Sequence, residues 1–236
     1  MTKLSVNINK IATLRNARGG DNPNLIQFAR DCEEFGADGI TIHPRPDERH
    51  VRKEDVLDLK KVVKKEFNIE GYPSKEFIKL ILLILPTQVT LVPDPPHALT
   101  SNSGWDIKKN KQFLKNVLKQ FQSTGIRTSI FINPELEMVK RAKEVGSDRI
   151  ELYTGPYANN YNINKEMAIE KYIKASNLAN EIDLDINAGH DLNLINLNYF
   201  IKKIPTICEV SIGHALICDT LYFGLKNTIE SYKKEL

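Results

Sequence analysis

Residues 36–50 read GADGITIHPRPDERH and contain the end of a helix, a short strand and a polar loop in direct succession. Gly36 stands where a left-handed helix cap belongs, and residues 39–43 are a β-branched run that ends at His43. The next seven residues hold two arginines, two carboxylates, a second histidine and two prolines. So many proton-transfer and anion-binding groups after a strand predict a site for a phosphorylated substrate.

Eight strand-like runs recur along the chain, with helical patterns between most of them. The runs are residues 4–8, 39–43, 67–70, 88–92, 127–132, 149–152, 184–187 and 209–212. Apolar residues at helical spacing are clearest within residues 25–35, 113–121 and 168–182. This alternation predicts a (β/α)8 TIM barrel in a single domain over residues 1–236. A doubly wound open sheet is the alternative, because alternation alone does not prove closure.

Two turns that precede predicted strands share a pattern four units apart. Residues 36–40 (GADGI) precede the second strand, and residues 146–150 (GSDRI) precede the sixth. Either the halves of a barrel repeat one turn, or helix-to-strand turns simply favour Gly and Asp. A third signal, Asn133-Pro134, is typical of a helix start, with Asn133 as the N-cap and Pro134 at the first helical position.

Composition excludes several classes of protein. The chain has 236 residues, 41% of them hydrophobic, and no apolar run of the roughly 20 residues that cross a membrane. Its start, MTKLSVNINK, lacks the apolar core of a signal peptide. Three cysteines without metal-ligand spacing favour a reduced, cytoplasmic protein. A net charge of +3, with lysines spread along the chain, gives no reason to expect nucleic acid or membrane partners.

Polar side chains collect where the predicted strands end, which is where barrel enzymes place their chemistry. They include Asn7, Asn9, Lys10, Arg15 and Arg18; His43, Arg45 and His50; Glu70; His97, Thr100 and Ser101; Glu151; His190 and Asp191; and Gly213-His214. Four of the five histidines of the chain fall on or just after a predicted strand end. Arg15 and Arg18 suit phosphate binding, although each alone could be a surface cation.

Two carboxylates, Glu70 and Glu151, lie in otherwise apolar strands. Burying a carboxylate costs several kcal/mol unless it is paired or protonated, so a functional site is favoured over core. Arginines crowd the same loops and no His-x-His pair lies on the first strand, which argues against a catalytic metal. No predicted strand ends in a lysine except for Lys10 just past the first, which argues against Schiff-base chemistry. The residues therefore predict general acid–base catalysis on phosphate esters.

At this point the chain resembles the pyridoxine 5′-phosphate synthase family, in segments that run in order from end to end. The segments are residues 6–20 (VNINKIATLRNARGG), 36–50, the Glu70 strand, LVPD with Thr100, and residues 150–158 (IELYTGPYA), 186–193 (INAGHDLN) and 211–217 (SIGHALI). The resemblance implies condensation of 3-amino-2-oxopropyl phosphate with 1-deoxy-D-xylulose 5-phosphate to give pyridoxine 5′-phosphate, phosphate and water. It also implies a barrel with additional helices, a homo-oligomer that is commonly an octamer, and no metal or organic cofactor.

The resemblance assigns roles to individual positions. His43 and Glu70 are the implied proton acceptors, His190 a proton donor, and Glu151 a group that stabilises a transition state. The implied contacts of the amino-ketone phosphate are Asn7, Arg18, Gly213 and His214, and those of the pentulose phosphate are Arg45, His50, Thr100, Asn9 and Lys10. Asp191 occupies a further substrate-contact position.

The sequence departs from the family pattern in two places. An Asp-His pair expected after the first strand is Asn9-Lys10, and a glycine expected after His190 is Asp191. Lys10 cannot accept a hydrogen bond as a neutral histidine can, and an aspartate repels a phosphate unless its side chain points away. Two alternatives stay open. One is another phosphosugar barrel enzyme of the epimerase or aldolase type, and the other is a catalytically silent, ligand-binding barrel.

Overall fold

Eight parallel strands close into a barrel in the computed structural model, which describes residues 1–94 and 101–236. Each strand pairs with the next, and β8 (Ile207–Ile212) pairs with β1 (Lys3–Asn7), which excludes the open sheet. The other strands are β2 (Gly39–Ile42), β3 (Glu66–Gly71), β4 (Gln88–Leu91), β5 (Arg127–Ile132), β6 (Arg149–Tyr153) and β7 (Asp185–Gly189). The predicted (β/α)8 barrel is confirmed.

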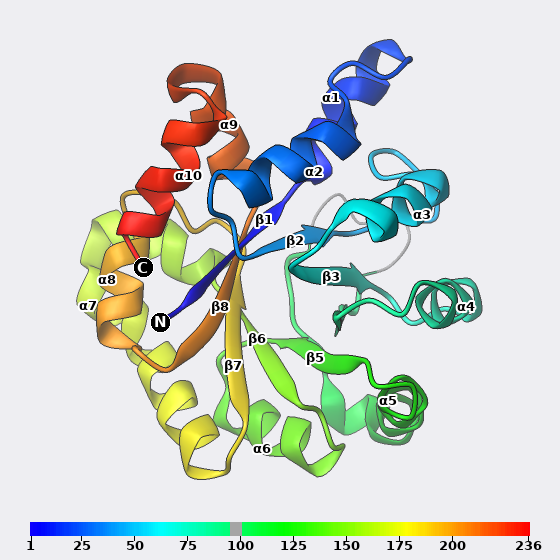
Figure 1. Cartoon of the computed structure of the whole chain (residues 1–236). Helices are drawn as coiled ribbons and strands as arrows, with labels where there is room; N and C mark the ends of the chain where they lie inside the picture. Colours follow the sequence, from blue (N-terminus) through cyan, green and yellow to red (C-terminus); the bar gives the residue numbers. More distant parts are fainter. Residues whose placement is uncertain (95–100) are drawn as a thin grey trace.

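Helices surround the strands on all sides of the barrel, as Figure 1 shows. Within the described ranges they are α1 (Asn9–Arg18), α2 (Leu25–Glu34), α3 (Lys53–Val62), α4 (Lys75–Ile84), α5 (Ile107–Gln122), α6 (Leu136–Glu144), α7 (Gly155–Glu181), α8 (Leu197–Lys203), α9 (His214–Phe223) and α10 (Leu225–Lys234). Two helices, α1 and α2, lie between β1 and β2, and another two, α9 and α10, follow β8, which matches the expected additional helices. The helices α1 and α9 project beyond the rest of the barrel (Figure 1).

Alternation along each strand separates an apolar outside from a polar inside. In β1, Leu4 and Val6 are fully buried in the hydrophobic core between the strands and helices. The intervening Ser5 shares a 2.7 Å hydrogen bond with Thr41 of β2, inside the barrel. Asn68 of β3 continues this polar layer, since its side chain donates to Thr41. The strands therefore carry polar side chains inward all the way to the ends where the site lies.

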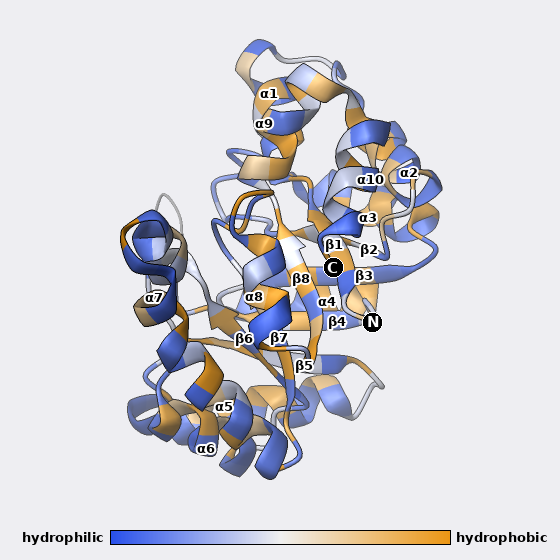
Figure 2. Cartoon of the chain, turned by 90° about the vertical axis from the view of Figure 1, so that its left-hand side faces the viewer, coloured by the Kyte–Doolittle hydropathy of each residue, from blue (hydrophilic) through white to orange (hydrophobic). Residues whose placement is uncertain are grey.

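The hydrophobic side of the strands and helices is visible in Figure 2, where the central strands are mostly orange and the helices alternate between orange and blue. α2 illustrates the pattern, because Leu25, Ala29 and Cys32 on one face are all buried. Among the described residues, no helix is both long enough and apolar enough to cross a membrane.

The repeated turn in the sequence has a repeated structure. Asp38 accepts a 2.8 Å hydrogen bond from the backbone N–H of Leu4 in the preceding strand, and Asp148 accepts one of the same length from Thr128. Gly36 and Gly146 both adopt positive φ angles, of 112° and 82°. The two halves of the barrel therefore use the same Gly-x-Asp device to tie an incoming strand to its neighbour.

Most strand boundaries differ from the predicted ones by one or two residues, and one helix start was wrong. α6 begins at Leu136 with Glu135 as its N-cap, not at Pro134. Asn133 does not cap that helix, because its side-chain oxygen accepts a hydrogen bond from the backbone N–H of Gly104. The cap signal was misleading because this amide serves a neighbouring loop.

Candidate active site

A cavity of about 390 Å³ lies at the carboxyl ends of the strands. Its lining residues are Asn7, Asn9, Lys10, His43, Arg45, His50, Glu70, Val92, Ser101, Phe131, Glu151, His190, Asp191, Ser211, Gly213 and His214. All the predicted site residues are among them except Arg18 and Thr100. Thr100 and His97 lie outside the described residues, whereas Arg18 is exposed at the end of α1 and does not line the cavity.

His43 and Glu70 face each other at the centre of this cavity. His43 follows β2 directly, and its backbone N–H donates a 2.9 Å hydrogen bond to the side-chain oxygen of Asn9. Its Nδ1 lies 3.7 Å from Oε2 of Glu70, a distance that one small side-chain movement converts into a hydrogen bond. Burial and the positive charge of Arg45 hold the pKa of His43 well below its usual value, so the ring is uncharged at neutral pH.

Two buried carboxyl groups, Glu70 and Glu151, stand on β3 and β6. Burial, followed by the nearby charge of Asp94, raises the pKa of Glu70 to about 7. Burial and the Glu70 carboxylate raise the pKa of Glu151 well above its usual value. At neutral pH Glu70 therefore exchanges a proton readily, while the raised pKa of Glu151 favours its protonated form, which can donate a hydrogen bond.

Gly189 of β7 makes room for the Glu151 carboxyl group. A Cβ atom at position 189 would lie 2.4 Å from Oε1 of Glu151, too close for any real contact. Neighbouring strands hold this backbone on both sides, since Gly189 pairs with Tyr153 and with Ser211. The glycine is thus required by the position of a carboxyl oxygen rather than by its own backbone angles.

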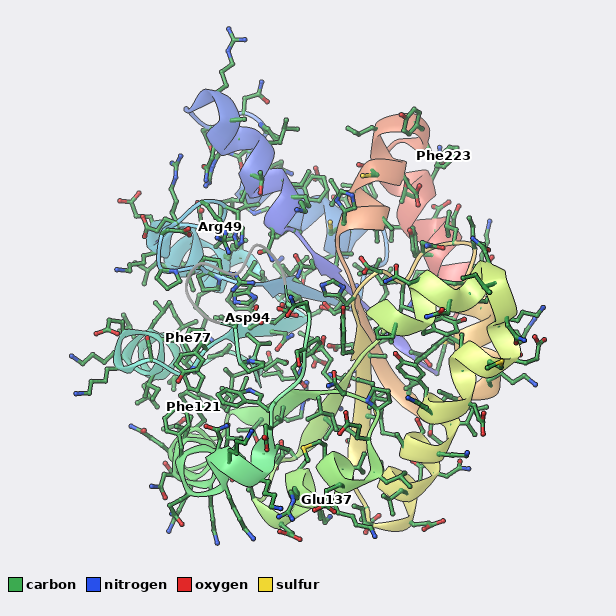
Figure 3. The ribbon with its side chains drawn as sticks, turned by 180° about the vertical axis from the view of Figure 1, so that it is seen from behind. Arg49, Phe77, Asp94, Phe121, Glu137 and Phe223 are labelled. Atoms are coloured by element: carbon green, nitrogen blue, oxygen red, sulfur yellow. The ribbon has the colours of Figure 1, made fainter. Side chains whose placement is uncertain are left out.

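Arg45 is held by a buried acid that the sequence did not single out. Its Nη2 donates to Oδ2 of Asp94 at 2.6 Å, and both side chains are almost completely buried. The hydroxyl of Ser101 donates to the same oxygen of Asp94. Asp94 lies at the centre of the side chains in Figure 3. This pairing fixes the guanidinium group at the cavity wall, where it can bind a phosphate.

His50 has its ring orientation and its tautomer set by the loop. Nδ1 accepts a 2.9 Å hydrogen bond from the backbone N–H of Val51, which places the ring proton on Nε2. Burial and the charge of Arg45 lower its pKa to about 4, so the neutral ring presents an N–H donor to the cavity. Arg15 and Asn16 both donate to the backbone oxygen of His50 and hold this loop from outside.

Arg15 is neither a surface cation nor a phosphate ligand. Its guanidinium group makes two hydrogen bonds to Asp55, at 2.6 and 2.8 Å, and its side chain is 3% exposed. The arginine-rich segment after β1 therefore splits into a buried structural residue, Arg15, and an exposed one, Arg18. Sequence spacing alone did not distinguish them, because the acid that pairs with Arg15 lies 40 residues away.

Three residues that line the cavity were not named as candidates from the sequence, and a fourth, Ser101, was named only as a polar residue near a strand end. Ser211 and Phe131 are inward-facing positions of β8 and β5, Val92 follows β4, and Ser101 lies in the β4–α5 connection. Strand parity could have identified Ser211 and Phe131, because inward positions alternate along each strand. Among the described residues, no group of three or more His, Cys, Asp or Glu side chains is arranged to hold a metal ion.

A second cavity of about 520 Å³ lies beside α7 and is lined in part by Tyr153, Tyr172 and Met167. Its lining within the described part of the chain includes one lysine and one glutamate, Lys171 and Glu135, and no histidine. The acid–base groups lie instead in the cavity at the strand ends, which is therefore the candidate active site.

Comparisons with known proteins agree with this geometry. The family model "Pyridoxal phosphate biosynthesis protein PdxJ" matches residues 4–236. A pyridoxine 5′-phosphate synthase of Bacteroides thetaiotaomicron is 62% identical over 233 residues, which cover 99% of this chain and 98% of the relative. One of Cytophaga hutchinsonii is 60% identical over 236 residues, covering 100% and 99%.

More distant solved structures share the fold alone. Phosphoribosylanthranilate isomerase of Thermotoga maritima superposes with a TM-score of 0.60 at 13% identity, covering 100% of this chain and 98% of the other. A tryptophan synthase chain of M. tuberculosis gives a TM-score of 0.65 at 10% identity, covering 99% and 93%. Both are consistent with a barrel of this class.

Proposed function

Because the chain belongs to the PdxJ family of pyridoxal phosphate biosynthesis proteins, we propose that the cavity at its strand ends is where it forms pyridoxine 5′-phosphate by general acid–base catalysis. The activity is that of the curated relatives, pyridoxine 5′-phosphate synthase. The observation that supports this site most strongly is the pairing of an uncharged His43 with Glu70, whose pKa is about 7. The two groups can pass protons to and from a substrate at neutral pH.

The substrates supply part of the chemistry themselves. The amine of 3-amino-2-oxopropyl phosphate attacks the ketone of 1-deoxy-D-xylulose 5-phosphate to form an imine, so no lysine of the protein is needed. The remaining steps are enolisation, loss of phosphate, dehydration and ring closure, and each one moves protons. His43 and Glu70 accept protons, and His190 donates one to a departing group. The protonated Glu151 donates a hydrogen bond to oxygen that gains negative charge, as a neutral buried acid can.

The phosphate groups are bound at two sides of the cavity in this proposal. Arg45 and the N–H of His50 bind the pentulose phosphate, together with Lys10 at the start of α1. Asn7, Gly213 and His214 bind the other phosphate, where the backbone at the start of α9 offers N–H donors. Asn9 contributes indirectly, because its side-chain oxygen already accepts the backbone N–H of His43.

We further propose a homo-oligomer, an octamer by family resemblance, that works in the cytoplasm. Support for assembly comes from the exposed apolar end of α9, where Leu221, Tyr222 and Phe223 are 72%, 84% and 55% exposed. Phe223 lies at the outer end of this projecting helix in Figure 3. Three free cysteines suit a reducing compartment. Light scattering on the purified protein measures the mass, and a monomer at micromolar concentration would contradict the oligomer.

The direct test is to incubate the purified protein with both phosphates and to follow pyridoxine 5′-phosphate by absorbance and chromatography. Product is expected only when both substrates are present. Turnover of the pentulose phosphate without the amine would indicate an epimerase or aldolase instead. Binding of both phosphates without any product would indicate a silent, ligand-binding barrel.

A further inference from the structure

The carboxylate of Asp191 is turned toward the neighbouring catalytic histidine rather than toward a bound phosphate. Its Oδ2 lies 2.9 Å from Nδ1 of His190, within hydrogen-bonding distance. The hydrogen bond from His190 is the largest influence that lowers the pKa of Asp191, so the acid is ionised at neutral pH. An ionised carboxylate can only accept, so the proton of this hydrogen bond belongs to Nδ1 of the histidine.

An unusual backbone produces this contact. His190 and Asp191 have φ angles of 90° and 62°, two consecutive left-handed residues that are not glycine. The hydroxyl of Thr154 donates to the backbone oxygens of Gly189 and His190. The side-chain amide of Asn196 donates to the backbone oxygen of Asp191. Such conformations are strained and persist where the surroundings enforce them, most often at functional sites.

The other side of the His190 ring is fixed as well. The ring meets Tyr153 edge to face, with centroids 5.1 Å apart and planes at 83°. Burial, followed by the charge of Asp191, raises the pKa of Tyr153, so the phenol is neutral and adds no charge. Glu70 interacts electrostatically with His190, and His214 interacts in the same way with Asp191. Among the described residues, Glu70, Tyr153 and His214 are thus titratable groups that face the His190–Asp191 pair.

We propose that Asp191 is a positioning residue for catalysis, which holds the proton of His190 on Nδ1 and assigns proton transfer to Nε2. This inference rests on the proposed function and replaces the substrate contact expected for Asp191. In the dehydration step, protonated His190 gives the Nε2 proton to the departing hydroxyl, which leaves as water with the electron pair of its C–O bond. The neutral ring keeps its Nδ1 proton against Asp191 and then takes a new proton from solvent at Nε2.

Two substitutions of Asp191 distinguish the effect of its carboxylate from the effect of its backbone conformation. Asp191→Gly deletes the side chain and suits a φ of 62°, and Asp191→Asn keeps the shape and the left-handed conformation while it removes the charge. We expect Asp191→Gly to lower kcat by about 10–100-fold, the usual effect of losing such a partner, with KM for both substrates changed less than about 3-fold. Asp191→Asn should lie between Gly and wild type, because its amide oxygen can still accept from Nδ1. Thermal unfolding of each variant checks that the barrel is intact.

The decisive measurement needs no substrate. Long-range ¹H–¹⁵N spectra of ¹⁵N-labelled protein distinguish protonated from bare ring nitrogens, and five histidines give few signals to assign, with His190 identified by its absence in His190→Gln. At alkaline pH the wild type should carry the His190 proton on Nδ1, and Asp191→Gly should shift it toward Nε2. An unchanged tautomer overturns the proposal, as does a raised KM with unchanged kcat. If no pyridoxine 5′-phosphate forms at all, the proposed function fails, while the spectra still decide the role of Asp191.

Discussion

Replacing Gly189 by alanine is expected to displace the Glu151 carboxyl group while leaving the barrel folded. The added Cβ would lie 2.4 Å from Oε1 of Glu151, whereas ordinary contact begins at 3.4 Å, so the oxygen must retreat by about 1 Å. The backbone cannot easily move instead, because β7 is paired on both sides at this residue. Gly189 has no left-handed φ, so alanine introduces no backbone strain of its own.

A misplacement of about 1 Å at a catalytic group can reduce the rate by about 100-fold. We therefore expect Gly189→Ala to lower kcat for pyridoxine 5′-phosphate formation by about two orders of magnitude, with a melting temperature close to that of the wild type. The assay is steady-state product formation with both phosphates at saturation, together with thermal unfolding.

Glu151→Asp provides the matched control for this prediction. The shorter side chain of this variant places its carboxyl oxygens farther from position 189. Adding Gly189→Ala to Glu151→Asp should therefore lower kcat far less than Gly189→Ala lowers it in the wild type. The reasoning would be refuted by a folded Gly189→Ala protein with wild-type kcat. Fully additive losses in the double variant would refute it too, because the alanine would then act through something other than Glu151.

Four other substitutions have defined outcomes. His43→Ala and Glu70→Gln should each lower kcat by about 10²–10⁴-fold with an intact circular dichroism spectrum, and near-wild-type turnover would remove that residue from the mechanism. Asp94→Asn should raise KM for the pentulose phosphate more than it changes kcat, because it loosens Arg45; an unchanged KM in titrations would contradict that role. Burial raises the pKa of Glu209 to about 7. In the unfolded chain Glu209 loses its proton near pH 4.5, below its pKa of about 7 in the folded protein, so the free energy of unfolding decreases as pH rises from about 4.5 to 7. The melting temperature of Glu209→Gln should therefore decrease less than that of the wild type over this pH range.

The fold was predictable because its main signals are local. Most strands are short runs with β-branched residues and several helices carry an apolar face, and these patterns depend on residues close together in the chain. The Asn133-Pro134 signal failed for the opposite reason, since Asn133 bonds to Gly104 in a different connection. Helix α6 therefore begins two residues after Pro134.

The site was predictable in its chemistry and less so in its pairings. Histidines and acids at strand ends converge in a barrel whatever the details, so His43, Glu70 and His190 were found in one cavity. The pair of Arg45 with Asp94 spans 49 residues, and the contact of Gly189 with Glu151 depends on the register of β6 and β7. Such long-range contacts are properties of the assembled barrel, and no fixed spacing of residues in the sequence predicts them.

Asp191 shows the same limit in another form. The sequence placed it beside His190 and left open whether its side chain met the substrate. Only the left-handed backbone at both residues turns the carboxylate back onto the histidine ring. A pattern of neighbouring residue types does not specify such a conformation when neither residue is glycine.

The pH dependence of kcat/KM tests most directly whether the Glu70–His43 pair accepts the protons. Glu70 acts as an acceptor only when ionised and its pKa is about 7, so activity should fall as pH drops through about 7. The substrate phosphates also titrate, near pH 6, so the residual activity of Glu70→Gln serves as the reference. This variant should keep any decrease in activity that comes from the substrates and should lose the decrease near pH 7. A wild-type profile that stays flat down to about pH 5, or a limb near 7 that survives in Glu70→Gln, would contradict this assignment.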